Sequence, residues 1–242
     1  MFNLNSGLID YIFEGGVSNA GTYYFVFFSF LFLVLFVSYL LGSINTAILI
    51  SRLVYHDDIR TKGSGNAGMT NMLRSFGGKA ALMTLVGDLL KTVISVFLAG
   101  LVFGFGYVGA ISTEPMCYVA GLFSVLGHVF PVYYRFKGGK GVLSTASMVL
   151  VLAPFAFLIL FGIFAGVVAL SKYVSLGSIS AAVMLPVLIH GYFKAVIGLP
   201  PHGLASLSAI ILAILIVWCH RANIIRISNR TENKLSFGKK ED

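Results

Sequence analysis

Long apolar runs separated by clusters of basic residues are the feature that most constrains how this chain can fold. The runs are Tyr23–Leu41 (continuing to about Val54), Ala80–Phe105, Met116–Val132, Val142–Ala169, Val174–Tyr192 and Leu204–Trp218. Each run is near the roughly 20 residues that a helix needs to cross a lipid bilayer. Because 57% of the residues are hydrophobic and only 11% are charged, the sequence predicts an all-α polytopic membrane protein and excludes an ordinary soluble domain.

The connections between the apolar runs alternate between basic and nearly cation-free. Of the 17 Lys and Arg residues, Lys91 lies within an apolar run and Lys194 lies in a connection of the nearly cation-free set. The others are Arg52, Arg60, Lys62, Arg74, Lys79, Arg135, Lys137, Lys140, Lys172, Arg221, Arg226, Arg230, Lys234, Lys239 and Lys240. The positive-inside rule places the connections that carry these residues in the cytoplasm.

The charge pattern also decides how many segments the chain needs. A single helix over Val142–Ala169 would place Lys172 and the basic tail outside the cell, against the positive-inside rule. Pro154 interrupts this run, and proline inside a helix removes a hydrogen bond and clashes with the preceding turn. We therefore expect two shorter helices, about Val142–Ala153 and Phe155–Ser171. The result is a seven-helix bundle with a broken or partial fourth segment, its N-terminus outside and its C-terminus in the cytoplasm.

This topology divides the chain into three parts. We expect an extracytoplasmic N-terminal extension over residues 1–22, a seven-segment transmembrane domain over residues 23–222 and a basic cytoplasmic tail over residues 223–242. The extension carries Asp10 and Glu14 but no Lys or Arg. Because a signal peptide begins with a basic segment, we do not expect one here.

Composition also bears on partners and cofactors. The net charge of +8 follows from the topology, so it does not indicate a nucleic-acid partner. A basic inner face instead attracts anionic lipid headgroups and anionic substrates. Cys117 and Cys219 lie in apolar runs without the spacing of metal ligands, and we expect both to be buried thiols. The sequence indicates no metal, no cofactor and no obligate protein partner.

The first inner loop combines glycines with polar side chains between two cations. It carries Gly63, Gly65 and Gly68, the polar residues Ser64, Asn66, Thr70 and Asn71, and the flanking Lys62 and Arg74. Glycines let successive backbone N–H groups converge on an anion, and an arginine adds a bidentate fork that fits phosphate. The alternative is a flexible tether with cations at the membrane boundary, which needs few directional donors.

The second inner loop carries His128 and then a glycine–lysine block over residues 136–141, Phe-Lys-Gly-Gly-Lys-Gly. A lysine and glycines beside a helix start are typical of phosphate binding. The spacing differs from that of the P-loop, and no strand precedes the block. This loop is a weak signal by itself, but a second cationic loop on the same face strengthens it.

Three further groups have both a structural and a functional interpretation. Ser175 and Ser178 follow the third inner connection, where either could simply cap the next helix. His220 and Asn223 lie one helical turn apart, although an interfacial belt explains a histidine there equally well. Within the second run, Asp88 and Lys91 share one helix face. They form either a structural ion pair or a pair that orients the substrate loops.

Together these loops resemble a bacterial membrane family, the acyl-phosphate-dependent glycerol-3-phosphate acyltransferases. The resemblance rests on Gly63-Ser-Gly-Asn-Ala-Gly-Met-Thr-Asn71 with Arg74, on Gly127-His-Val-Phe-Pro131 with Phe136-Lys-Gly-Gly-Lys-Gly-Val142, on Tyr173-Val-Ser-Leu-Gly-Ser178 and on His220-Arg-Ala-Asn-Ile224. It covers about residues 35–235. Ala67, Met69 and Gly177 depart from the family pattern, but they remove no polar group of the motifs.

The resemblance implies a seven-helix fold in the bacterial cell membrane, with a groove open to the cytoplasm. It implies transfer of a fatty acyl group from long-chain acyl phosphate to the 1-hydroxyl of glycerol 3-phosphate, which yields lysophosphatidic acid and phosphate. The catalytic residues carried over by motif position are Ser64, Arg74, Lys140, Ser178, His220 and Asn223. The substrate-binding residues are Lys62, Gly63, Gly65, Asn66, Gly68, Thr70, Asn71, His128, Lys137, Gly138, Gly139, Gly141 and Ser175.

Within this set, glycine amides around Gly65, Gly68 and Gly138–Gly141 are expected to cradle phosphates, and Thr70 and Asn71 to support the first loop. Acyl phosphate is an activated mixed anhydride, so the enzyme mainly needs positioning, charge neutralisation and oxyanion donors. The resemblance implies that no strong protein base is required and that a substrate phosphate helps to accept the proton. His220 is a candidate helper.

Two other function classes share these sequence features. A transporter for an organic or phosphorylated anion would also use basic inner loops and a broken segment. A transferase that takes its acyl group from acyl-CoA or an acyl carrier protein is the second alternative. The polar residues gather at the inner face rather than the membrane midplane, and no inverted repeat is visible in the sequence. Both observations favour the acyltransferase.

Overall fold

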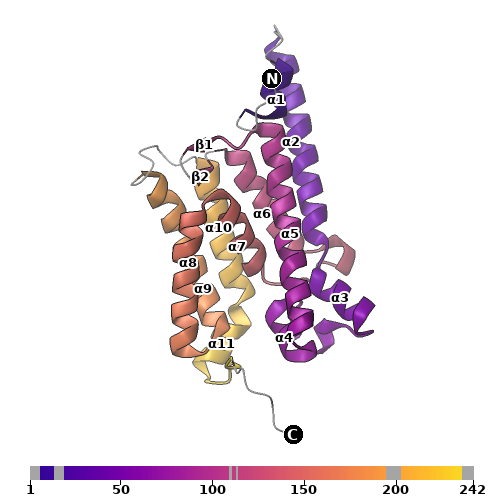
Figure 1. Ribbon diagram of the computed structural model, residues 1–242, viewed down its shortest axis with the longest axis vertical. Helices are drawn as coiled ribbons and strands as arrows, with labels where there is room; N and C mark the ends of the chain where they lie inside the picture. The colour runs from indigo at the N-terminus through magenta and orange to yellow at the C-terminus, as the bar shows by residue number, and fades with distance from the viewer. Residues whose placement is uncertain (1–5, 14–18, 109–110, 113, 195–202, 236–242) are drawn as a thin grey trace.

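The structure, a computed structural model, describes residues 6–13, 19–108, 111–112, 114–194 and 203–235 (Figure 1). Its helices are α1 (Gly7–Phe13), α2 (Ala20–Ser43), α3 (Thr46–Val54), η1 (Ile59–Thr61), α4 (Met69–Phe76), α5 (Gly78–Phe103), α6 (Pro115–Val129), η2 (Val132–Tyr134), α7 (Val142–Leu152), α8 (Pro154–Ser171), α9 (Val174–Tyr192), α10 (Gly203–Cys219) and α11 (Arg221–Ser228). Two short antiparallel strands, β1 (Tyr107–Val108) and β2 (Ile111–Ser112), interrupt the helical chain between α5 and α6. Lys239 and Lys240 of the expected tail, and Glu14 of the extension, lie outside these ranges.

The described helices confirm an all-α protein that crosses the membrane several times. Five helical segments are long and apolar enough to span a bilayer, and α10 with α11, which bend by 53°, make a sixth if they are one span. These five lie at Ala20–Ser43, Gly78–Phe103, Pro115–Tyr134, Pro154–Ser171 and Val174–Gly191. The helix α7 is apolar but shorter. The exact number of crossings, seven in our sequence analysis, therefore stays a prediction.

The predicted break near Pro154 is confirmed. The helix α7 ends at Leu152, Ala153 adopts φ −150° and ψ 67°, and α8 begins at Pro154. Proline fits the first position of a helix because the N–H that it lacks would be unpaired there. The sequence therefore ends one helix and starts the next at this residue.

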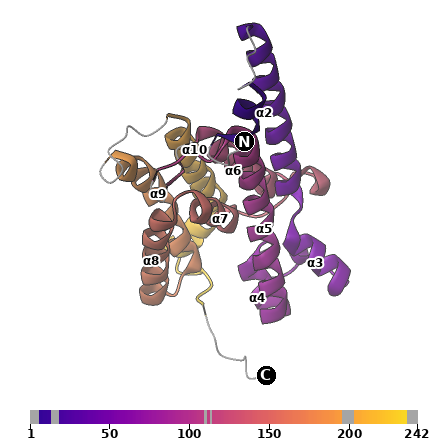
Figure 2. The same cartoon turned by 45° about the horizontal axis from the view of Figure 1, so that its top comes forward.

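A second break divides the first apolar run. The helix α2 ends at Ser43 and α3 begins at Thr46, so the run does not continue as one helix to Val54. Asn45 caps α3, because its side chain accepts a hydrogen bond of 3.1 Å from the N–H of Ile48. This break lets α3 leave the α2 axis at the end of the bundle that also carries α4 (Figure 2).

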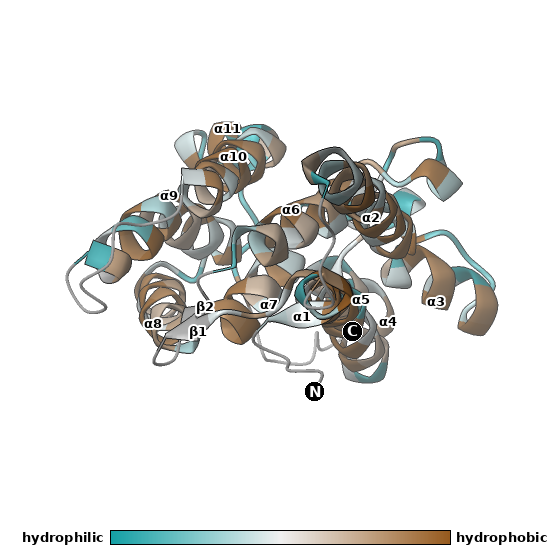
Figure 3. Cartoon of the chain, turned by 90° about the horizontal axis from the view of Figure 1, so that it is seen from above, coloured by the Kyte–Doolittle hydropathy of each residue, from teal (hydrophilic) through white to brown (hydrophobic). Residues whose placement is uncertain are grey.

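The helices approach each other closely at small residues, and many large apolar side chains lie on the outer surface. The helix α2 packs on α5 and α6, and α9 lies between α8 and α10. Gly42 of α2 lies against the backbone of Ser124, and Gly127 of α6 against the carbonyl of Tyr39, so neither glycine has room for a side chain. Phe25 and Phe32 are exposed by 74% and 72%. Most outward helix faces are hydrophobic, as a lipid environment requires (Figure 3).

Part of the N-terminal extension is ordered by contact with the bundle. The helix α1 packs against α5, and the backbone of Gly7 lies close to Phe103 and Gly104. Ile9 is only 3% exposed. The helix α2 begins at Ala20, within the segment that we expected to precede the transmembrane domain.

Candidate functional site at one end of the bundle

The polar loops identified in the sequence meet at the end of the bundle that carries α3, α4 and α11, at the bottom of Figure 1. Four connections between distant segments define this place. Arg74 Nη2 donates to the carbonyl of Asn233 over 3.3 Å, and Lys140 Nζ donates to Asn223 Oδ1. Ser175 Oγ donates to Glu232 over 2.8 Å, and the N–H of Leu235 donates to the carbonyl of Lys172 over 2.7 Å.

Asn71 holds the first inner loop in one conformation. Its side chain is 2% exposed and accepts a 3.0 Å hydrogen bond from the N–H of Ser64. Its Nδ2 donates to the carbonyls of Lys62 and Asn66 over 2.9 and 3.0 Å, and to Ile59 over 3.2 Å. This network argues against the flexible-tether alternative, because one buried amide fixes the loop at several points.

The cations and hydroxyl of the same loop face outward. Ser64, Lys62 and Arg74 are exposed, and Lys62 pairs with Asp57 over 2.9 Å. Arg74 lies in the last turn of α4, while the partly buried Thr70 lies in its first turn. The exposed guanidinium of Arg74 is therefore free to face an anion on its solvent side.

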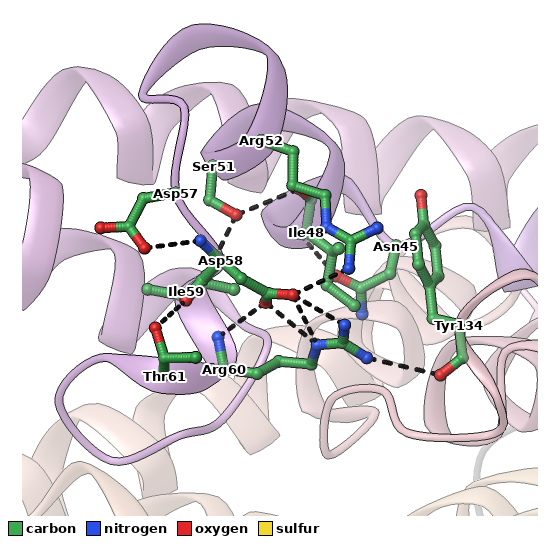
Figure 4. Close-up of polar contacts among 10 residues, drawn as sticks. All are labelled: Asn45, Ile48, Ser51, Arg52, Asp57, Asp58, Ile59, Arg60, Thr61 and Tyr134. Carbon is green, nitrogen blue, oxygen red and sulfur yellow. Dashed lines mark hydrogen bonds and ion pairs between the residues drawn. The ribbon is translucent and has the colours of Figure 1, made fainter.

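Asp58 anchors the start of the loop, as Figure 4 shows. Its carboxylate accepts hydrogen bonds of 2.7 Å from Arg60 Nη2 and 2.8 Å from Arg52 Nη2. The hydrogen bonds from Arg60 and Arg52 hold the pKa of Asp58 well below its usual value. Arg60 Nη1 also reaches the carbonyl of Tyr134 over 3.4 Å, so this cluster joins the first loop to the second.

Amides around Gly65, Gly68 and Gly138–Gly141 were expected to cradle phosphates, and four of these N–H groups have partners within the loops. The N–H groups of Gly65 and Gly68 donate to the carbonyls of Lys62 and Asn66 over 2.9 and 3.1 Å. Those of Gly138 and Gly139 donate to the carbonyls of Val129 and His128, over 3.2 and 3.1 Å. These hydrogen bonds hold the loops in shape, and the expectation that amides around these glycines cradle phosphate stays a prediction.

Gly139 is required where the two inner loops touch. A side chain there would collide with the His128 ring and with the carbonyl of Ala67, which belongs to the first loop. Gly141 has φ 78°, a conformation that glycine adopts easily, and directly precedes α7. Lys140 lies between these two glycines, so its backbone position is closely set.

His128 belongs to a buried charged cluster rather than to an exposed binding surface. It is 4% exposed, and its Nδ1 lies 2.8 Å from Lys91 Nζ. Lys91 Nζ also lies 2.8 Å from Asp88 Oδ1 and donates to the carbonyl of Ile44 over 3.0 Å. The ion pair predicted from the sequence is present, and through His128 it also touches the second inner loop.

The residues from the C-terminal part of the chain adjoin Lys140. Burial lowers the pKa of Lys140 to about 8, although the Glu232 carboxylate opposes this effect. His220 is 3% exposed, and its Nδ1 lies 2.8 Å from the carbonyl of Ile216. Because a carbonyl only accepts, Nδ1 carries the proton and Nε2 of a neutral His220 is the acceptor.

The two serines after the third inner connection do not cap α9. Tyr173 is the N-cap residue of that helix and makes no side-chain capping bond. Ser178 Oγ donates to the carbonyl of Val174 over 2.9 Å, whereas Ser175 Oγ bonds to Glu232. The structure therefore brings Lys140, Asn223 and Ser175 into one hydrogen-bonded group. Lys137, by contrast, is exposed on the second loop.

Sequence reasoning missed Glu232 and Arg226 as members of this group. Glu232 accepts from Asn223 Nδ2 and from Arg226 Nε, both over 2.7 Å. One signal was available: Glu232 is the first acidic residue after Glu114, and it follows Arg221, Arg226 and Arg230. An isolated carboxylate among cations indicates a specific partner.

These observations define a class: a helical integral membrane protein with a cationic polar site at one end, suited to phosphorylated substrates. Comparison with known proteins is consistent with this class. A family model described as glycerol-3-phosphate acyltransferase matches residues 32–230. The chain belongs to this family of membrane acyltransferases, which decides against the transporter alternative.

The matches with named relatives extend over nearly the full length of those relatives. A glycerol-3-phosphate acyltransferase of Chlorobium luteolum is 38% identical, with 85% of this chain and 97% of the relative covered. One from Trichlorobacter lovleyi is 41% identical, with 81% and 93% covered. The crystal structure of PlsY, an integral membrane glycerol 3-phosphate acyltransferase in its glycerol 3-phosphate form, matches with a TM-score of 0.74 and 35% identity, covering 86% of this chain and 96% of that one. The lysophosphatidic acid form of PlsY matches with a TM-score of 0.72 and 31% identity, covering 85% and 95%.

Proposed function

We propose that this protein transfers a fatty acyl group from acyl phosphate to the 1-hydroxyl of glycerol 3-phosphate, giving lysophosphatidic acid and phosphate. One observation carries the proposal: Arg74 and Lys140, from separate loops, both connect to the segment that contains Asn223, Glu232 and Asn233. Two cations from different loops suit a reaction with two phosphorylated substrates. Solved relatives in glycerol 3-phosphate and lysophosphatidic acid forms support the acceptor and the product.

The chemistry needs little covalent help from the protein. The glycerol 3-phosphate hydroxyl attacks the carbonyl carbon of acyl phosphate, and the bond from that carbon to the phosphate oxygen breaks with its electron pair. Lys140 and Arg74 neutralise the substrate phosphates, while Ser64, Ser178 and Asn223 supply hydrogen bonds near the reacting groups. The hydroxyl proton passes to a substrate phosphate oxygen, with Nε2 of His220 as the nearby helper base.

An apolar groove supports an acyl-chain substrate. It lies between α9 and α10, has a volume of about 490 Å³ and is lined by Val183, Pro186, Ile210, Ala213, Ile214, Val217 and Trp218. Trp218 lies at the end of α10, two residues before His220 in the sequence. A fatty chain in this groove would extend into the bilayer while its acyl phosphate reaches Lys140.

The site faces the cytoplasm of a bacterial cell in this proposal. Residues 1–22 form an extracytoplasmic extension, residues 23–222 the seven-segment catalytic domain and residues 223–242 the cytoplasmic tail. The concentration of cations in the inner connections supports this orientation. Gly238→Cys in a background with Cys117→Ala and Cys219→Ala should resist an impermeant thiol reagent added outside intact cells. Labelling of this cysteine from outside would contradict the proposed orientation.

The donor is tested by offering purified protein acyl phosphate, acyl-CoA and acyl carrier protein in parallel and measuring lysophosphatidic acid. We expect turnover with acyl phosphate. Robust turnover with acyl-CoA and none with acyl phosphate would refute the proposal. The sequence indicates no metal, so we expect no metal requirement. A chelator should therefore leave the rate unchanged.

A further inference from the structure

The chain returns to the inner site after α11 and buries a carboxylate there. The N–H groups of Thr231 and Glu232 both donate to the carbonyl of Arg226, over 2.8 and 3.2 Å. These bonds turn the backbone back toward α9, where the N–H of Leu235 donates to the carbonyl of Lys172. In this turn the Glu232 side chain is only 6% exposed and pairs with Arg226.

The Glu232 carboxylate accepts hydrogen bonds from three side chains. Oε1 accepts from Ser175 Oγ over 2.8 Å and from Asn223 Nδ2 over 2.7 Å, and Oε2 accepts from Arg226 Nε over 2.7 Å. Burial favours the neutral acid, but the hydrogen bonds from Asn223, Arg226 and Ser175 hold the pKa of Glu232 below its usual value. The group is therefore an anion at neutral pH.

This anion decides which end of the Asn223 amide faces Lys140. A carboxylate only accepts, so Asn223 must present its NH₂ group to Glu232 and its oxygen to the opposite side. Lys140 Nζ donates to that oxygen. In the flipped orientation, the amide NH₂ would face an ammonium group and its oxygen would face a carboxylate, and both contacts are repulsive.

We propose that Glu232 is a positioning residue of the acyl-transfer site, which fixes the Asn223 amide and through it directs the Lys140 ammonium toward the substrate phosphate. The inference rests on the proposed function. Glu232 touches no reacting atom in this arrangement. Its role is to set the position and the charge of Lys140, which contacts the substrate phosphate.

The proposed contact predicts the direction in which the pKa of Lys140 changes in two variants. The charged and titratable groups near Lys140 are Glu232, Arg226, Cys219 and Arg74, together with His220, whose pKa Lys140 lowers. Glu232 raises the pKa of Lys140, whereas Arg226 lowers it. Loss of the Glu232 charge should therefore move the titration of Lys140 to lower pH, and loss of the Arg226 charge should move it to higher pH. If the Glu232 and Arg226 side chains lay away from Lys140, neither variant would shift its titration; the loss of kcat/KM then shows whether this contact also serves the reaction.

The test compares Glu232→Gln, Glu232→Ala and Arg226→Gln in detergent-purified full-length protein. Glu114→Gln, at the N-terminus of α6, is the matched control. We expect both Glu232 variants to lower kcat/KM roughly tenfold to a hundredfold, and the control to leave it unchanged. The pH dependence of Lys140 labelling by an amine reagent, read by mass spectrometry, should shift in the two directions given above. Glu232→Gln keeps the side-chain shape and an acceptor oxygen, so it also guards against simple misfolding.

Two outcomes would overturn the proposal. In the first, Glu232→Gln keeps both the native kcat/KM and the native Lys140 titration. In the second, the Glu232 variants bind glycerol 3-phosphate more tightly, which would show that the carboxylate competes with substrate phosphate and closes the site. Failure of the wild-type protein to make lysophosphatidic acid would instead refute the proposed function. The Lys140 titration needs no turnover, so the two failures are distinguishable.

Discussion

Lys91 Nζ lies 2.8 Å from Nδ1 of His128, which joins the middle of α5 to the end of α6. The same ammonium is 2.8 Å from Asp88 Oδ1, and Thr46 Oγ1 donates to that carboxylate oxygen over 3.0 Å. His128 in turn lies against Gly139 of the second inner loop. A buried ion pair therefore connects two helices, the start of α3 and a loop of the candidate site.

Breaking this cluster should destabilise the protein. Lys91→Met leaves the Asp88 carboxylate buried without its cation, and such a loss typically costs about 3–5 kcal/mol. The double variant Asp88→Leu/Lys91→Met should recover part of this loss, because neither charge is then left unpaired. Denaturant unfolding in detergent measures both effects. If the double variant lost as much stability as the two single substitutions together, Asp88 and Lys91 would not act as a unit.

Lys140→Ala should lower kcat/KM about tenfold to a hundredfold, because a hydrogen bond to a charged group contributes roughly 1.5–3 kcal/mol. Lys140→Arg should not restore full activity, since a planar fork does not replace a compact ammonium between Gly139 and Gly141. Steady-state kinetics with both substrates measures the loss. Lys194→Ala, an exposed lysine on the predicted outer side, is the control and should be near neutral.

Arg74→Ala should reduce kcat/KM by a similar factor of about ten to a hundred. The effect should fall on KM if Arg74 holds a phosphate in the ground state, and on kcat if it acts mainly as the leaving phosphate gains charge. Lys79→Ala removes another exposed cation at the start of α5 and should change neither constant. Near-native kinetics of both Arg74→Ala and Lys140→Ala in folded protein would refute the phosphate-binding interpretation of the two loops.

The pH profile of kcat/KM should fall on its basic side near pH 8. Burial lowers the pKa of Lys140 to about 8, so the ammonium that binds phosphate is lost as the pH rises through this value. In Lys140→Arg the remaining activity should lack this limb, because a guanidinium does not titrate in that range. An unchanged basic limb in Lys140→Arg would assign it to another group.

Asn71→Asp should destabilise the first inner loop. The substitution replaces a donor with an oxygen that faces the carbonyls of Lys62 and Asn66, and an unsatisfied buried polar group costs about 1–3 kcal/mol. We expect a lower Tm and loss of activity. Thr61→Ala, at an exposed site of the same segment, should change stability by no more than about 0.5 kcal/mol. A native Tm for Asn71→Asp would show that the loop does not depend on this amide.

Hydropathy and single residues predicted the helical elements well. A backbone in lipid must satisfy its own hydrogen bonds, so long apolar runs become helices whatever their neighbours are. Pro154 separated α7 from α8 because proline acts through its own ring and its missing N–H. The break between α2 and α3 was not predicted. It depends on Asn45, which caps α3 and also donates to the carbonyl of Ala67 in the distant first loop, over 3.3 Å.

The sequence by itself determined the membrane class, the helical runs and the polar loops that form the inner site, because apolar length, charge placement and proline act locally. Only the tertiary structure decided how those loops use their polar groups. The amides of Gly138 and Gly139 bond to the end of α6, His128 joins Lys91, and Glu232 returns to Asn223. Hydrogen bonds are directional and act over about 3 Å. Their partners are therefore set by how distant helices pack, which no local pattern in the chain specifies.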